Sequence, residues 1–97
     1  MKFQLGKTVQ TQGIAHESKD DPIFARNIQA IFTRYINGDW GDLCDDDKKM
    51  NDDAVATGDD RILASYLVPT ATAETKKVYI ITEYDRSVTT VLFADEY

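Results

Sequence analysis

The sequence predicts an α+β fold: one small domain over residues 1–97, with the element order β-α-α-β-β-β and an antiparallel meander packed against two helices. The first half of the chain carries apolar residues at helical spacing, whereas the last third is rich in β-branched and aromatic residues. Short connections separate the last three extended segments, which favours antiparallel pairing. A hydrophobic share of 42% in 97 residues is enough for one core.

The N-terminal part is predicted to contain a short strand and the main core helix. Apolar residues set among polar ones over 3–9 indicate a strand or hairpin, and residues 14–18 are expected to form a helical turn. A wide apolar stripe then predicts a helix over residues 22–36. Asp21 can cap this helix ahead of a proline in the first turn, and Gly38 supplies a left-handed stop.

A second helix is predicted over residues 42–57, with Asp42 as its cap and Gly58 at its end. At about 100° per residue the apolar positions gather in one sector of this helix, and they are Leu43, Met50 and Ala54. Asp47 and Asn51, four residues apart, fall inside the same sector. The other aspartates are predicted to point away from it: Asp42, Asp45, Asp46, Asp52 and Asp53.

Three strands are predicted after the second helix. They cover residues 62–68, ended by Pro69, residues 77–83 and residues 88–93. Each segment is rich in the β-branched and aromatic residues that fit a half-buried sheet. The turn between the last two strands is predicted over residues 84–87.

Negative charge is concentrated in the middle of the chain. Nine aspartates lie between Asp39 and Asp60, and only Lys48 and Lys49 oppose them. The segment therefore carries nine minus two, or seven net negative charges, whereas the whole chain carries six. A field of this kind repels nucleic acid and attracts basic surfaces. We therefore expect a basic protein surface as the partner and no direct nucleic-acid binding.

Signals for membrane insertion and secretion are missing from the sequence. No apolar run approaches the roughly 20 residues that span a bilayer, and residues 1–13 contain no apolar segment typical of a secretory signal. The single cysteine, Cys44, cannot form an internal disulfide, which fits a reducing compartment. We therefore expect a cytoplasmic protein without membrane contact.

No catalytic residue, cofactor or metal site is predicted. Residues 45–47 begin like a calcium-binding loop, but Lys49, Met50 and Ala56 stand where an oxygen ligand, a glycine and a glutamate are required. His16 is the only histidine, which excludes a two-histidine metal site. No serine lies in the G-x-S-x-G motif of serine hydrolases.

A recognisable string of residues spans the second half of the chain: Gly38-Asp39-Trp40-Gly41-Asp42-Leu43, Asp47, Asn51, Arg61-Ile62-Leu63, Tyr66, Ile80-Ile81-Thr82-Glu83, Asp85-Arg86-Ser87, Thr89-Thr90-Val91-Leu92 and Glu96-Tyr97. This string resembles a family of small bacterial proteins carried by plasmids, phages and other mobile elements. The resemblance covers residues 38–97 well and the N-terminal third loosely, where this chain has a longer helical insert around residues 16–32. It implies a mobile-element origin and no particular activity.

Two candidate sites follow from these patterns. The first is an acidic partner-binding surface, with Trp40 either at its rim as an interface anchor or packed over the core as a lid. Its carboxylates are Asp42, Asp45, Asp46, Asp52 and Asp53. The second is a polar network in which a carboxylate inside the apolar sector pairs with arginine and amide groups, as buried structure or as a ligand pocket. Its members are Asp47, Asn51, Arg61 and Arg86.

The leading functional hypothesis is a non-enzymatic protein that docks its acidic helix onto a basic surface of a partner, such as a nuclease or a defence complex. Carboxylates along a helix can imitate a row of phosphates, so a counter-defence inhibitor or nucleic-acid mimic fits a mobile-element origin. One alternative is a ribonuclease, because the element order is similar to that of RelE-type toxins; in that analogy Arg61 and Arg86 would stabilise phosphate charge and a terminal tyrosine would assist. Another alternative is a regulatory module that forms homodimers through a sheet edge or the long apolar helix.

Overall fold

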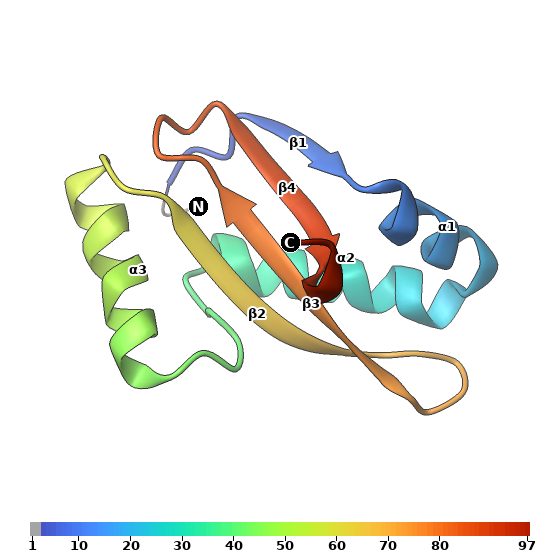
Figure 1. Ribbon diagram of the computed structural model, residues 1–97. Helices are drawn as coiled ribbons and strands as arrows, with labels where there is room; N and C mark the ends of the chain where they lie inside the picture. The colour runs from blue at the N-terminus through green and yellow to red at the C-terminus, as the bar shows by residue number, and fades with distance from the viewer. Residues whose placement is uncertain (1–2) are drawn as a thin grey trace.

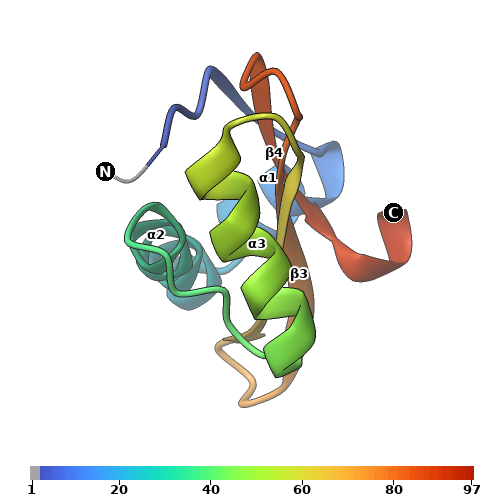
Figure 2. The ribbon, with the colours of Figure 1, turned by 90° about the vertical axis from the view of Figure 1, so that its left-hand side faces the viewer.

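The predicted α+β fold is confirmed by the computed structural model, which describes residues 3–97. Helix α2 crosses one face of a four-stranded sheet, α1 packs against α2 and β4 at the end of β1, and α3 lies beside the edge strand β2 (Figure 1). A view from the α3 end shows α2 on one side of the sheet and the C-terminal turn η1 on the other (Figure 2). The elements are β1 (Lys7–Gln10), α1 (Gln12–Asp20), α2 (Pro22–Ile36), α3 (Asp45–Thr57), β2 (Ile62–Pro69), β3 (Thr75–Thr82), β4 (Val88–Phe93) and η1 (Ala94–Glu96).

The sheet has the strand order β1-β4-β3-β2. Strands β2, β3 and β4 form the predicted antiparallel meander. The N-terminal strand β1 pairs in parallel with β4, with Lys7 opposite Val88 and Gln10 opposite Val91. A parallel pair requires a long crossover connection, and here all three helices and two strands lie between the paired segments.

Helix α2 has the bounds that its sequence predicts, because both of its ends are specified locally. The Asp21 side chain accepts hydrogen bonds from the backbone N–H groups of Ile23 and Phe24, at 3.0 and 3.1 Å. Gly38 follows the last turn with a φ of 81°, a conformation that favours glycine. The helical turn expected around residues 14–18 is a longer helix, α1, which is capped by the Thr11 side chain.

Helix α3 begins at Asp45 and not at Asp42, with Cys44 as the N-cap residue. The reason is that the preceding loop pairs with β2: the Asp42 N–H donates to the Ser65 carbonyl at 2.8 Å, and Gly41 forms a parallel bridge with Ser65. Gly41 has a φ of 79°, and a Cβ there would lie 1.9 Å from the Ser65 carbonyl oxygen. This close approach requires glycine and keeps residues 41 and 42 out of the helix.

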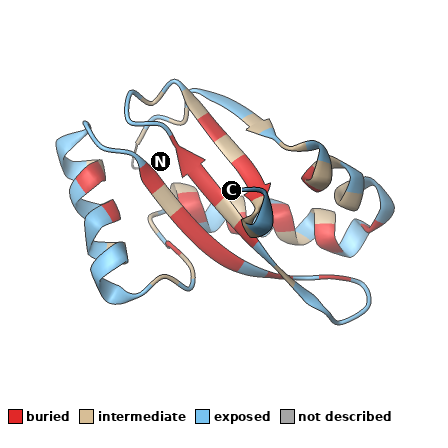
Figure 3. Cartoon of the chain, in the orientation of Figure 1, coloured by how far each residue is buried: buried red, intermediate tan, exposed pale blue. Residues whose placement is uncertain are grey.

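The core lies between α2 and the sheet (Figure 3). It includes a directed chain of buried hydroxyl groups. The Thr89 hydroxyl donates its only proton to the Leu5 carbonyl at 2.7 Å, so Thr82 must donate to Thr89 at 2.8 Å, and Tyr35 must donate to Thr82 at 2.6 Å. Burial raises the pKa of Tyr35 well above its ordinary value, which keeps the phenol protonated as the first donor of the chain.

None of the helices within residues 3–97 combines the length and the apolar character needed to cross a membrane.

Candidate functional site

The acidic helix α3 stands at one end of the molecule, along the outer edge of β2 (Figures 1 and 3). The prediction that the five candidate carboxylates point outward is confirmed: all five are exposed, four of them on α3 and Asp42 in the loop before it. We call this set the acidic face; its members are Asp42, Asp45, Asp46, Asp52 and Asp53.

Few basic groups neutralise this region. Lys49 forms an i,i+4 salt bridge with Asp53 at 3.1 Å, and both side chains are mostly exposed, at 75% and 65%. Arg34 pairs with Asp39 at 2.8 Å and lowers the pKa of that carboxyl. In the part of the chain that the structure describes, no other salt bridge reaches residues 39–60. Because exposed pairs contribute only about 0–1 kcal/mol, most of the negative charge stays open to solvent.

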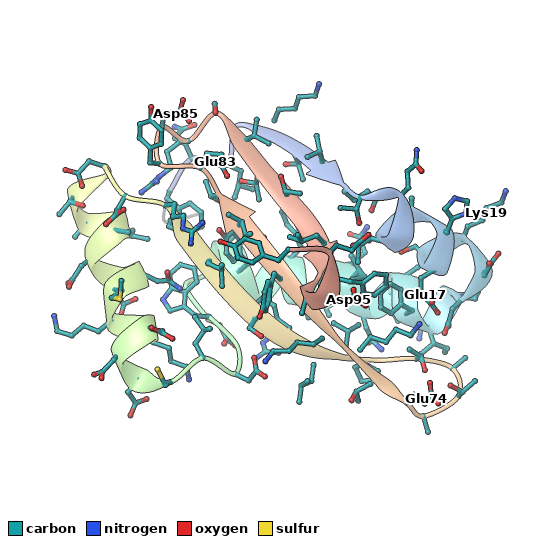
Figure 4. All side chains as sticks on the ribbon, viewed as in Figure 1. Glu17, Lys19, Glu74, Glu83, Asp85 and Asp95 are labelled. Carbon is teal, nitrogen blue, oxygen red and sulfur yellow. The ribbon has the colours of Figure 1, made fainter. Side chains whose placement is uncertain are left out.

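Other carboxylates do not form a second acidic surface. Figure 4 shows the labelled ones outside α3 spread over separate elements: Glu83 and Asp85 at the β3–β4 turn, Glu74 at the tip of the β2–β3 hairpin, Asp95 on η1 and Glu17 on α1. The strong negative field therefore belongs to the α3 end of the molecule.

Three of the aspartates also stabilise α3 itself. Residues 45–47 form the first turn of the helix, and the N-cap residue Cys44 makes no side-chain hydrogen bond to it. The positive end of the helix dipole interacts with first-turn carboxylates, each contributing about 0.3–1 kcal/mol at exposed positions. Part of the aspartate cluster thus has a structural reason as well as any functional one.

The prediction that Trp40 serves as an exposed anchor is wrong. Trp40 is only 3% exposed and packs against Tyr35 and Phe3, with ring centroids 5.6 and 5.9 Å away. Its indole N–H donates to the Asp52 carboxylate at 2.9 Å. The alternative interpretation, a lid over the core, describes its position, and its contact with the acidic face is to hold Asp52 in place.

The predicted polar network does not form as a unit, and its amide has a different role. Asn51 is 5% exposed and lies against the edge of β2. Its side-chain amide donates to the Leu63 carbonyl at 2.8 Å and accepts from the Leu63 N–H at 3.3 Å. Asn51 therefore takes the place of a neighbouring strand at this residue and fastens α3 to the sheet.

Arg86 stabilises the other end of α3. Its guanidinium donates to the carbonyl of Ala54 in the last turns of the helix, at 2.9 Å. It also donates to the carbonyls of Asp60, Glu83 and Tyr84. A cation near a helix C-terminus interacts favourably with the dipole. Arg86 therefore joins α3, the loop after it and the β3–β4 turn, and its guanidinium is occupied by backbone.

Asp47 and Arg61 are exposed, and no salt bridge within residues 3–97 includes Asp47, so the prediction of a carboxylate buried in the apolar sector and paired with arginine is wrong. Because α3 starts late, Asp47 falls in its first turn. The Arg61 guanidinium lies over the Tyr97 ring, 5.8 Å from its centroid. Asp47, Asn51 and Arg61 nevertheless line one hollow of about 260 Å³ between α3 and β2, while Arg86 does not. Leu43, Met50, Asp60 and Leu63 complete the lining.

Among the residues that hold the acidic helix against the sheet, Asn51 and Arg86 were predicted as members of a polar network with other partners, whereas Gly41 and Ser65 were not predicted. Gly41 and Ser65 form the bridge between the α2–α3 loop and β2, and Asn51 binds the strand edge. The available signals were a glycine between Trp40 and Asp42 and an amide placed among apolar residues. Neither signal identifies the residue that is contacted, because the contacted residues lie 12 or more positions away in the sequence.

Comparison with models of protein families, with curated proteins and with solved structures finds no match to this chain. The resemblance to mobile-element proteins therefore stays a prediction from the motif.

Proposed function

We propose that the protein is a small, non-enzymatic binding protein whose acidic face docks onto a basic surface of a partner protein. The observation that carries this proposal is the exposure of all five carboxylates of the acidic face at one end of the molecule. Among them, only Asp53 takes part in a salt bridge within residues 3–97.

A rigid support for the carboxylates favours docking over a merely solvated surface. Asn51 binds the β2 edge, Arg86 binds the carbonyl of Ala54, and Trp40 binds Asp52. Side chains and helices that are already positioned lose less conformational freedom on binding. At physiological salt the field of the face extends about 8 Å, which speeds the approach of a basic surface.

The spacing of the carboxylates fits a nucleic-acid-binding channel as the docking partner. Asp45 and Asp52 are seven residues apart on α3, or roughly 10 Å at 1.5 Å per residue. This separation is about three nucleotide steps along one DNA strand at 3.4 Å per step. A row of lysine and arginine side chains that binds phosphates can therefore bind such a face. A nuclease or defence complex has this chemistry and fits the mobile-element resemblance.

The ribonuclease alternative is less well supported by the geometry. It needs both Arg61 and Arg86 on a phosphate, whereas Arg86 already donates to backbone carbonyls. A net charge of −6 also opposes the approach of RNA.

Two quadruple variants with the same change in net charge test the proposal. The first, Asp42→Asn, Asp45→Asn, Asp46→Asn and Asp53→Asn, neutralises the acidic face and spares Asp52, which binds Trp40. The control neutralises four exposed carboxylates on other elements, and consists of Asp20→Asn, Glu74→Gln, Glu83→Gln and Asp95→Asn.

Each variant is used as bait in a bacterial lysate, and the captured partner is then purified and titrated at low and high salt. The wild type and the control should bind, with affinity falling steeply as salt rises, and the acidic-face variant should not bind. Equal binding by the two variants, with both folded by circular dichroism, would show that the acidic face only keeps the protein in solution.

A further inference from the structure

The two edges of the sheet differ in how their backbone groups are used. At the β2 edge, the Asn51 amide binds both backbone groups of Leu63. The α2–α3 loop binds both backbone groups of Ser65, through the Trp40 carbonyl at 3.3 Å and the Asp42 N–H at 2.8 Å. Farther along, the Asn27 amide donates to the Pro69 carbonyl, and Pro69 has no N–H. Within residues 3–97, only the outward groups of Leu67 stay open along β2, so this edge cannot readily pair with another strand.

The β1 edge is open. The N–H groups of Lys7 and Thr11 point toward β4 and donate to Ser87 and Val91, at 2.9 and 3.1 Å. Because backbone groups alternate along a strand, those of Thr8 and Gln10 point outward. Within residues 3–97 no hydrogen bond reaches them. Figure 1 shows β1 on the side of the sheet away from α3, with no element beyond it.

A partly apolar groove runs beside this open edge. A hollow of about 380 Å³ lies between β1 and α2. Thr8, Val9, Gln10 and Gln29 contribute to its lining, and its apolar part comes from Ile28, Phe32 and Val91. Phe32 is only half-buried although it belongs to the long core helix. The unpaired backbone and the uncovered apolar surface thus lie together at one edge.

This edge is also the part of the sheet farthest from the acidic face. With strands about 4.8 Å apart, β1 lies roughly 14 Å from β2 across the sheet. A helix packed beyond β2 adds about 10 Å, so α3 is about 24 Å from β1. This distance is about three Debye lengths at physiological salt. Lys7 is the only charged residue of β1. A second copy can therefore approach this edge without strong repulsion, in spite of the negative net charge.

We propose that the β1 edge binds a second copy of the chain, with β1 pairing antiparallel to β1 about a two-fold axis at Val9. In this register Thr8 of each copy exchanges two backbone hydrogen bonds with Gln10 of the other copy. Val9 lies opposite Val9, and Lys7 lies opposite Thr11, so no like charges meet. A second copy fits better than an unrelated strand because the same contact covers the open edges of both chains.

The assembly would be a continuous sheet of twice four strands, with an acidic helix at each far end. The two helices would be roughly 50 Å apart, from the strand and helix spacings above. Such a dimer presents two separate acidic faces, so it can bind a repeated basic surface with higher avidity than one face alone. The dimer itself does not depend on the proposed partner.

Sedimentation over a range of protein concentrations tests the pairing. Thr8→Pro removes an outward N–H without touching the Lys7 or Thr11 donors that hold β1 to β4. Val9→Lys places two lysines opposite each other and should raise the dimer dissociation constant about tenfold or more. Leu67→Pro makes the proline change on an exposed residue of the β2 edge and is the matched control, which should dimerise like the wild type.

Cross-linking provides a positive test. Directly opposed, non-hydrogen-bonded residues in antiparallel strands have Cα atoms about 4.5 Å apart, within the range of a disulfide. In a Cys44→Ser background, Val9→Cys should form disulfide dimers on mild oxidation and Leu67→Cys should not. A wild-type chain that stays monomeric at every concentration, or a dimer that Thr8→Pro and Val9→Lys leave unchanged, overturns the proposal.

Discussion

Replacement of Asn51 by alanine should loosen the acidic helix from the sheet. The change removes two hydrogen bonds to Leu63, at 2.8 and 3.3 Å, from a side chain that is 5% exposed. Each bond contributes about 0.5–1.5 kcal/mol net, and unpaired groups in a partly buried site cost about 1–3 kcal/mol. Alanine recovers about 0.5 kcal/mol through its higher helix propensity. We expect a loss of about 2 kcal/mol in the free energy of unfolding.

The chain contains a matched control for this substitution. Asn27 also lies within a helix, and its amide makes one exposed hydrogen bond, to the Pro69 carbonyl at 3.0 Å. Asn27→Ala carries the same gain in helix propensity and should change stability by less than about 0.5 kcal/mol. In thermal unfolding, Asn51→Ala should lower the Tm by roughly 8–16 °C, at 4–8 °C per kcal/mol for a domain of this size. Equal effects of the two changes would refute the role assigned to Asn51.

A carboxyl at position 51 gives the same reasoning a pH dependence. Asn51→Asp keeps an acceptor for the Leu63 N–H but places a carboxylate against the Leu63 carbonyl. Burial and the facing carbonyl should raise the pKa of the introduced carboxyl in the folded state. The added instability should therefore be absent below about pH 4, the unfolded value, and should grow as pH rises toward the folded pKa. Urea unfolding across this pH range measures the difference in the free energy of unfolding between Asn51→Asp and the wild type. A difference that does not depend on pH would contradict the contact between residue 51 and the Leu63 carbonyl.

Three further predictions concern the supports of the fold. Arg86→Lys should lower the free energy of unfolding in urea by about 2 kcal/mol, because an ammonium group cannot span the carbonyls that the guanidinium binds. It should also speed backbone hydrogen exchange at the C-terminal end of α3. Unchanged exchange there would argue against the role of Arg86 in holding this end of the helix. Tyr35→Phe should lower the free energy of unfolding by about 1 kcal/mol in the same assay. Thr89→Val should lower it more, because this change also leaves the Leu5 carbonyl unpaired. Equal losses would contradict the directed chain of hydroxyl groups. Hydrogen bonds from the backbone N–H groups of Ala71, Phe24 and Ile23 lower the pKa of Asp21, so its contribution is present above the unfolded pKa near 3.9 and is lost as pH falls through the folded pKa. As pH falls through this range, the free energy of unfolding should therefore decrease less steeply in Asp21→Asn than in the wild type. Identical slopes of this free energy against pH would count against the contribution of Asp21.

Structural features that depend on neighbouring residues could be predicted from the sequence, whereas features that depend on distant contacts could not. The bounds of α2 could be predicted because its cap, Asp21, and its stop, Gly38, are adjacent to the helix that they end. The start of α3 could not, because the competing partner of Asp42 is the backbone of Ser65, 23 positions along the printed sequence. Helical periodicity correctly places Asp47 on the same side of α3 as Met50 and Asn51, but the sequence does not show that Asp47 stays exposed there.

Charge and alternation are properties of the chain itself, so the sequence alone determined that the molecule has an acidic middle segment, one long amphipathic helix and a C-terminal meander. Tertiary structure decided which groups stay available. It buried Trp40 against Tyr35, occupied the Arg86 guanidinium with carbonyls and covered the β2 edge with Asn51. It also paired β1 with β4 and left its outer side open. These outcomes depend on which segments meet in space, and a backbone donor or acceptor carries no mark of its distant partner in the sequence.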